Sequence, residues 1–180
     1  MLKLDHIKKT FNPGTVNEKA AIRDLSLHLE PGDFATVIGS NGAGKSTMFA
    51  AIAGSFITDS GSITLNGKDI TFAPEYQRSR VIGRLFQDPL KGTAPHMTIE
   101  ENLIAVRLDQ PPFTKGIMMN KSGQDAYAKE MVEQFDIRPA DYNLPTSSLS
   151  GGNAQKVVVA REVSLGNKLL VASQPTRGVD

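Results

Sequence analysis

The sequence predicts an α/β fold in which mostly parallel strands alternate with helices. Three short apolar runs, at 34–38, 81–86 and 169–172, indicate the strands of the central sheet. The first run leads into a glycine-rich loop and a helix, which places a binding site at the carboxyl ends of the strands. Because 180 residues can bury one sizeable core, we expect a single domain over residues 1–180.

The first 70 residues predict a small antiparallel sheet beside this core. Residues 2–7 and 21–29 alternate apolar and polar side chains as strands do, and a Pro-Gly turn ends the second run. Residues 62–65 form a third apolar alternation, followed by Asn-Gly, a dipeptide typical of a two-residue hairpin turn.

Residues 39–47, GSNGAGKST, fit the phosphate-binding pattern G-x-x-x-x-G-K-[ST]. Glycines let the backbone curl so that successive N–H groups point at phosphate oxygens. Lys45 supplies a positive charge for the β- and γ-phosphates, and the Ser46 hydroxyl is an oxygen ligand for Mg²⁺. The strand before the loop and the helix expected over 47–53, ending at Gly54, favour this interpretation over a chance glycine-rich turn. The predicted nucleotide-binding residues here are Gly39, Ser40, Asn41, Gly42, Ala43, Gly44, Lys45, Ser46 and Thr47.

The middle of the chain, residues 95–150, predicts a helical subdomain. A Thr-Ile-Glu-Glu capping box at 98–101 opens one helix. Residues 122–135 carry apolar side chains on one face of another helix. Between them, residues 109–120 are expected to form a loop, whose methionine pair is either packed or an adaptable contact surface.

A second candidate anion site occurs at LSGGNAQK, residues 149–156, just before an apolar helical run. Ser150 is a good N-cap, and Gly151 and Gly152 leave the backbone bare at the start of the helix. Taken alone, Ser-Gly-Gly is also an ordinary loop sequence. Its position, about 105 residues after the phosphate-loop lysine and before another apolar strand, favours a functional interpretation.

In this order of motifs the chain resembles the ATP-binding cassette (ABC) ATPases over almost its whole length. The resemblance implies a P-loop NTPase core of ABC type, with an antiparallel β subdomain and a helical subdomain. It also implies that ATP and Mg²⁺ are bound between two cassettes that face head to tail. Ser150, Gly151 and Gly152 would then contact the γ-phosphate held by the phosphate loop of the partner cassette.

The resemblance assigns roles to two further residues. Gln87 stands at the position of the Q-loop glutamine, where it would reach Mg²⁺ and the attacking water; its other interpretation is a strand-end residue. Phe11 stands where the family has an aromatic residue that stacks on adenine, and its other interpretation is a core residue.

The family pattern breaks after the strand at 169–172. Two acidic residues are expected there, one for Mg²⁺ and one for the attacking water, and this chain has Ser173 and Gln174. Serine carries no charge for hydrated Mg²⁺, and glutamine can orient a water but cannot accept its proton. We therefore expect Gln174 to stand at the catalytic position and hydrolysis at this chain's own site to be slow.

The carboxyl half departs from the family in two further ways. The chain stops at Asp180, before the family's next strand and switch histidine. The resemblance therefore implies a cassette truncated after the strand at 169–172, the family's Walker B strand, and of marginal stability. Residues 1–106 resemble amino-acid-type importer ATPases, whereas residues 107–180 resemble the second cassette of simple-sugar or nucleoside importers. This join of two subfamilies near residue 107 is compatible with a natural recombinant, an assembly artefact or an engineered hybrid.

Composition excludes several classes of function. A net charge of +1 without a basic block argues against nucleic-acid binding, the absence of cysteine fits a reducing compartment, and no apolar run is long enough for a membrane span. The resemblance implies a cytoplasmic subunit, peripheral on the inner face of the cell membrane. Its expected partners are a second cassette, a transmembrane permease and a solute-binding protein, and its expected function is ATP-coupled solute import. The alternatives are a catalytically impaired regulatory cassette and a non-transport ABC ATPase.

Overall fold

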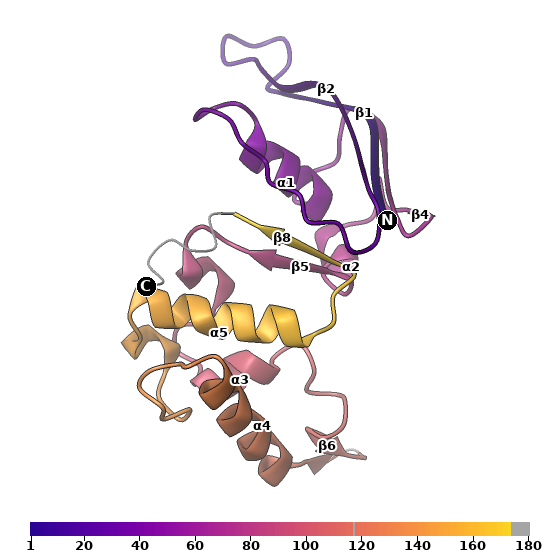
Figure 1. The fold of residues 1–180 in the computed structure, drawn as a ribbon. Helices are drawn as coiled ribbons and strands as arrows, with labels where there is room; N and C mark the ends of the chain where they lie inside the picture. Colours follow the sequence, from indigo (N-terminus) through magenta and orange to yellow (C-terminus); the bar gives the residue numbers. More distant parts are fainter. Residues whose placement is uncertain (117, 174–180) are drawn as a thin grey trace. The chain divides into compact units, whose positions relative to one another are not determined.

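The computed structural model describes residues 1–116 and 118–173 and divides into two compact units, Met1–Ile82 and Gly83–Asp180 (Figure 1). Both units contain buried apolar side chains. The single domain expected from the chain length therefore stays a prediction. None of the described helices is long and apolar enough to cross a membrane.

The first unit is built on a four-stranded antiparallel sheet with the strand order β2-β1-β3-β4. In the central pairing, Leu4 of β1 lies opposite Leu27 of β2 and Ile63 of β3. Asn66 and Gly67 have φ values of 50° and 77° between β3 and β4, as the Asn-Gly hairpin signal predicts. The predicted antiparallel sheet is confirmed. Its strands are β1 Leu2–Phe11, β2 Lys19–Leu29, β3 Ser60–Leu65 and β4 Lys68–Asp69.

Helix α1 (Lys45–Ala53) contacts β2 and ends at Gly54, which has a φ of 84°. The predicted helix and its glycine stop are confirmed. Helix α2 (Glu75–Arg78) is tied to the end of α1 by Arg78, whose Nη1 donates to Ala51 O at 2.7 Å and Ile52 O at 2.9 Å. This unit buries apolar side chains from the sheet and α1, among them Leu2, Leu4, Ile7, Ile22, Met48, Ala51, Ile52, Ile63 and Leu65.

The buried strand predicted at 34–38 is wrong in this structure. Residues 33–40 have no regular secondary structure, and the side chains of Phe34 and Ile38 are 94% and 89% exposed. A strand forms only when a neighbouring strand supplies backbone hydrogen bonds, and none of the sheets of the described residues includes this segment. Its apolar pattern indicates that it suits burial, but pairing depends on distant parts of the chain.

Strand β5 (Ile82–Leu85), which leads into the second unit, and β8 (Leu169–Ala172) are hydrogen-bonded neighbours in a two-stranded sheet (Figure 1). These strands confirm the apolar runs predicted at 81–86 and 169–172. Ser173 N donates to Leu85 O at 3.0 Å, so the carboxyl ends of the two strands lie together.

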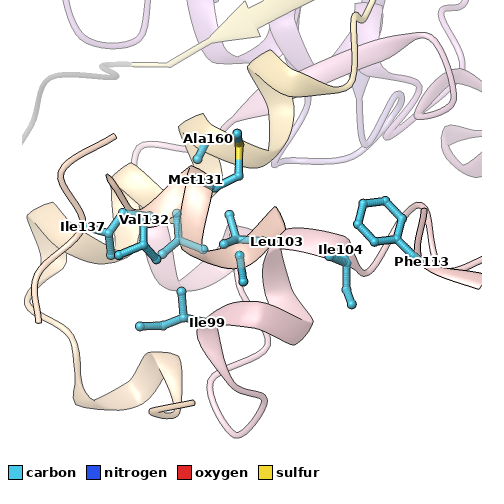
Figure 2. Close-up of a cluster of buried hydrophobic side chains, with 10 residues drawn as sticks. Ile99, Leu103, Ile104, Phe113, Met131, Val132, Ile137 and Ala160 are labelled. Atoms are coloured by element: carbon cyan, nitrogen blue, oxygen red, sulfur yellow. The ribbon is translucent and has the colours of Figure 1, made fainter. Parts of the chain in front are cut away.

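The helices of the second unit share one apolar core, shown in Figure 2. Helix α3 (Ile99–Ile104) contacts both α4 (Lys121–Gln134) and α5 (Gly151–Ser164). In sequence, the 3₁₀ turn η1 (Pro89–Gly92) precedes α3, and the 3₁₀ turn η2 (Thr146–Ser148) lies between α4 and α5. The buried residues of this core are Ile99, Leu103, Ile104, Phe113, Ala128, Met131, Val132, Ile137, Val157 and Ala160.

The capping box predicted at the start of α3 is confirmed. Thr98 Oγ1 accepts from Glu101 N at 3.1 Å, and Glu101 Oε2 accepts from Thr98 N at 2.8 Å. These two bonds satisfy N–H groups that a helix start leaves without intrahelical acceptors.

The loop predicted at 109–120 contains a short antiparallel pairing of β6 (Thr114–Lys115) with β7 (Met118–Met119), so the loop prediction is wrong at these residues. The side chains of Met118 and Met119 are 72% and 59% exposed, which excludes the packed alternative for this pair. Two-residue strands leave no alternation to read in the sequence, so their pairing could not be predicted.

Candidate functional site

The loop at 39–47 has the backbone geometry that its glycine pattern requires. Gly42 and Gly44 have φ values of 85° and 89°, in the left-handed region that favours glycine. Gly44 is also the N-cap of α1, and a Cβ added to it would lie 2.9 Å from Ala21 O of β2. The glycines therefore shape the turn and also allow it to lie close to the sheet.

Lys45, the first residue of α1, places its ammonium within this loop. Its Nζ donates to Gly39 O at 2.5 Å and to Ser40 O at 2.8 Å. The first N–H groups of a helix have no intrahelical acceptor. The Lys45 ammonium and the free N–H groups at the start of α1 therefore lie together at this loop. Ser46 and Thr47 continue the first turn of α1, and Ser46 is exposed. The loop fits an anionic phosphate chain.

The residues around the loop fit a triphosphate better than they fit Mg²⁺. Backbone N–H groups and an ammonium are the donors that phosphate oxygens need. Mg²⁺ prefers several oxygen ligands, commonly with a carboxylate among them. The motif offers the Ser46 hydroxyl, and Ser173 after β8 is uncharged. Among the residues that the structure describes, no group of three or more histidine or acidic side chains is arranged to hold a metal.

Ser150 is the N-cap of α5, as predicted from the sequence. Its Oγ accepts from Asn153 N at 3.4 Å and from Asn153 Nδ2 at 3.1 Å. A hydroxyl accepts two hydrogen bonds and donates one, so these contacts leave its proton free to donate to another acceptor. A Cβ added to Gly151 would meet no atom within 4 Å, so this turn is open. The geometry fits a second anion site, and its role stays a prediction.

Asn153 is a candidate site residue that sequence reasoning missed. Besides donating to Ser150, it accepts from Arg138 N at 2.7 Å through Oδ1. It therefore fixes the Ser150 side chain and joins it to the segment after α4. The available signal was a polar residue at the third helical position after a serine N-cap, the spacing of a capping box.

Phe11, at the end of β1, is partly buried. Its ring meets that of Phe56 edge to face, with the centroids 5.3 Å apart and the planes at 82°. Lys9 Nζ lies 5.7 Å and 5.6 Å from the Phe11 and Phe56 centroids and donates to Asp59 Oδ1 at 2.7 Å. Hydrogen bonds from Lys9 and from the Thr10 N–H hold the pKa of Asp59 below its usual value. An edge contact engages only part of the Phe11 ring, so the core and adenine-stacking interpretations both stay open.

Gln87 and Ser173 follow the carboxyl ends of the neighbouring strands β5 and β8. Gln87 is exposed and Ser173 is partly exposed. This arrangement agrees with binding at strand ends, as in open α/β sheets. Gln174 lies outside the described residues.

The chain has clear relatives among proteins of known function. It is 37% identical over 161 residues to the nucleoside import ATP-binding protein NupA of Lactococcus lactis, covering 88% of this chain and 32% of that protein. It is 33% identical over 183 residues to a tyrosine transport ATP-binding protein of Clostridioides difficile, covering 100% of this chain and 71% of that protein. The chain thus spans about a third of the length of NupA.

Solved structures support the fold. A dimeric ATP-binding cassette in a post-hydrolysis state, bound to ADP and Pi, matches the whole chain with a TM-score of 0.83. The match covers 76% of that cassette at 24% identity, so it shows the fold alone. A nucleotide-free ATP-binding cassette from an ABC transporter matches 99% of this chain and 70% of its own, with a TM-score of 0.76 and 28% identity. The predicted ABC-type P-loop NTPase fold is confirmed.

The family model described as ABC transporter matches residues 22–177. That range contains the phosphate loop, Gln87 and the Ser150 turn. By sequence and by fold, this chain belongs to the ABC transporter family.

Proposed function

We propose that this chain is the ATP-binding part of an ABC importer and couples ATP binding and hydrolysis to solute transport through a membrane permease. The observation that carries the proposal is the Lys45 ammonium, held within a loop whose Gly42 and Gly44 have left-handed backbones at the start of α1. The names of the relatives, nucleoside import and tyrosine transport ATP-binding proteins, support import. They leave the solute open between a nucleoside or sugar and an amino acid.

The proposed assembly pairs this chain with a second cassette, either another copy or a different chain. In the pair, Ser150, Gly151 and Gly152 of one cassette face the γ-phosphate on the phosphate loop of the other. The open Gly151 backbone and the free proton of Ser150 support this role. The further proposed partners are a permease and a solute-binding protein, with the cassette at the cytoplasmic face of the cell membrane. A net charge of +1 supports a function without nucleic acid.

Each site residue has a defined task in this proposal. Lys45 and the loop N–H groups bind the β- and γ-phosphates, and Phe11 stacks on adenine. Ser46 and Gln87 would hold Mg²⁺, which would neutralise charge at the phosphates. Gln87 and Gln174 orient the attacking water. Closure of the pair by ATP and its reopening after release would move the permease.

A second candidate function, a regulatory cassette with impaired catalysis, is favoured by Ser173. It directly follows β8, where a charged Mg²⁺ partner is expected, and its backbone N–H is already bonded to Leu85 O. Such a chain would bind ATP to close the pair, while the working hydrolytic site lies on the phosphate loop of the partner.

Measurements of ATP binding and of steady-state hydrolysis separate these functions. We expect the chain to bind ATP and to hydrolyse it slowly, because general-base catalysis is commonly worth about 10²–10⁴-fold in rate. The double variant Ser173→Asp with Gln174→Glu should raise turnover, whereas either change alone should do little. Lys45→Ala placed in the double variant is the control and should abolish the gain. Family-typical turnover by the unchanged chain would exclude impaired catalysis, and failure to bind ATP would exclude both functions.

A further inference from the structure

A buried polar network lies next to the Ser150 turn and has no role in the functions above. Its centre is Asn102 of α3, a side chain that is 2% exposed. Asn102 Oδ1 accepts from Ala94 N at 2.8 Å. Its amide lies within 2.9–3.3 Å of four acceptors, Thr98 O, Ala94 O, Met97 O and Thr146 Oγ1. A buried amide with this many partners holds the backbone around it in one arrangement.

Thr146 is the second member of the network and is fully buried. Its Oγ1 donates to Ala94 O at 3.0 Å, and its N–H donates to Met97 O at 3.0 Å. The next residue continues the contact, since Ser147 N donates to Pro95 O at 2.9 Å. The segment at 94–97 is therefore fastened to the start of η2 by backbone and side-chain bonds together.

The turn η2 leads directly into the Ser150 site. Leu149 is its C-cap, its N–H donates to Thr146 O at 3.1 Å, and its side chain packs against the helical core. The next residue, Ser150, is the N-cap of α5. Each of the three residues between Thr146 and Ser150 donates a backbone hydrogen bond, to Pro95 O, Pro145 O and Thr146 O in turn. The direction in which the chain enters the Ser150 turn is therefore tied to the network.

We propose that Asn102 and Thr146 are positioning residues for the phosphate-contacting turn Ser150–Gly152. They act by fixing η2, so that the Ser150 hydroxyl and the N–H groups of Gly151 and Gly152 point outward together. The inference rests on the proposed function, in which this turn meets the γ-phosphate bound to a second cassette. The network makes the turn rigid before the phosphate arrives, which lowers the ordering cost of binding.

The test compares Thr146→Val, which keeps the volume and removes the hydroxyl, with Thr146→Ser, which keeps the hydroxyl. The matched control is Thr71→Val in the first unit, because Thr71 is also buried and its Oγ1 accepts from Ile63 N at 2.8 Å. Amide hydrogen exchange is measured at Asn153 and Ala154, whose N–H groups bond to Ser150. Mid-α5 amides serve as the internal reference.

For Thr146→Val we expect exchange at Asn153 and Ala154 to rise about tenfold while mid-α5 amides stay unchanged. Thr146→Ser and Thr71→Val should leave these two amides as in the unchanged chain. An equal rise throughout α5, or no rise at the two amides, would overturn the proposal, because the first indicates general destabilisation and the second indicates no coupling.

A second readout links the network to phosphate contact. Association of two copies is followed by sedimentation with ATP, for single changes Thr146→Val and Ser150→Ala and for their combination. If Thr146 acts through the Ser150–Gly152 turn, the combination should weaken association by less than the sum of the two single losses, with ATP affinity at the Lys45 loop unchanged. Additive losses would contradict the positioning role. If the unchanged chain does not associate with ATP, self-pairing in the proposed function fails, and the exchange result still decides the positioning.

Discussion

Replacement of Arg78 by methionine tests how the first unit holds the helix that follows the phosphate loop. Arg78 is 1% exposed, and its guanidinium donates to four backbone carbonyls: Ala51 O, Ile52 O, Thr71 O and Ala73 O, at 2.7–3.0 Å. Ala51 O also accepts from Gly54 N, so it keeps one partner in the variant. The chain therefore uses one buried cation to satisfy the end of α1 and the segment after β4.

The expected loss follows from Ile52 and Thr71, the two buried residues whose carbonyls, unlike that of Ala51, have no second donor outside the helix ladder. Ile52 and Thr71 are 3% exposed, and each would lose the Arg78 donor. A buried group left without a partner costs about 1–3 kcal/mol, so the two together cost about 2–6 kcal/mol. Methionine fills much of the arginine volume, which keeps the cavity contribution small. For a chain of this size, about 4 kcal/mol lowers Tm by about 8–16 °C.

Thermal unfolding followed by circular dichroism measures this loss. Arg80→Met is the matched control, because Arg80 is nearby in sequence and exposed. We expect the Arg80 variant to melt within about 2 °C of the unchanged chain, as surface substitutions usually do. If Arg78→Met melts at the same temperature as Arg80→Met, the assignment of this network as a stabilising anchor is wrong.

Three further predictions concern single positions. Gly54→Ala should lower Tm more than Gly67→Ala. Both glycines have φ near 80°, but only at Gly54 would an added Cβ collide with another atom, because it would lie 2.8 Å from Arg78 Nε. Equal shifts in Tm for the two variants would contradict this prediction. Because the pKa of Asp59 is lowered on folding, its contribution is present above the usual aspartate pKa of about 3.9 and is lost as pH falls through the lower folded value. Between about pH 4 and lower pH, the free energy of unfolding of Asp59→Asn should therefore fall less than that of the unchanged chain. Urea unfolding at several pH values measures this, and an equal fall in both proteins would refute it. Thr98→Ala removes the capping box of α3 and should cost about 1 kcal/mol in denaturant unfolding; an unchanged midpoint and slope would count against it.

Much of the fold could be predicted because its signals are local. The Asn-Gly hairpin, the Thr98 capping box and the Gly54 helix end each depend on a few adjacent residues, and the structure has all three. The strand predicted at 34–38 failed because pairing is not local. Phe34 has the pattern of a buried strand residue, but its burial needs a neighbouring strand that sequence alternation does not identify.

The candidate site divides in the same way. Lys45 and Ser150 could be found from motif spacing, because glycine geometry and helix N-caps are fixed by neighbouring residues. Asn102 and Thr146 could not, since they lie 44 residues apart and neither belongs to a motif. Only the fold brings these two side chains together, through the contact of α3 with the segment before α5.

The central claim is that the loop at 39–47 binds the phosphates of ATP, and equilibrium binding of labelled ATP tests it most directly. The comparison is between the unchanged chain, Lys45→Ala and the control Lys68→Ala, which removes an exposed lysine on β4 and leaves the net charge equal to that of the first variant. We predict that Lys45→Ala weakens binding at least about tenfold, since a charge-assisted contact is worth about 1.5–3 kcal/mol, while Lys68→Ala binds as the unchanged chain does. Equal affinity of the folded Lys45→Ala and Lys68→Ala variants, or no binding by the folded unchanged chain, would contradict the claim.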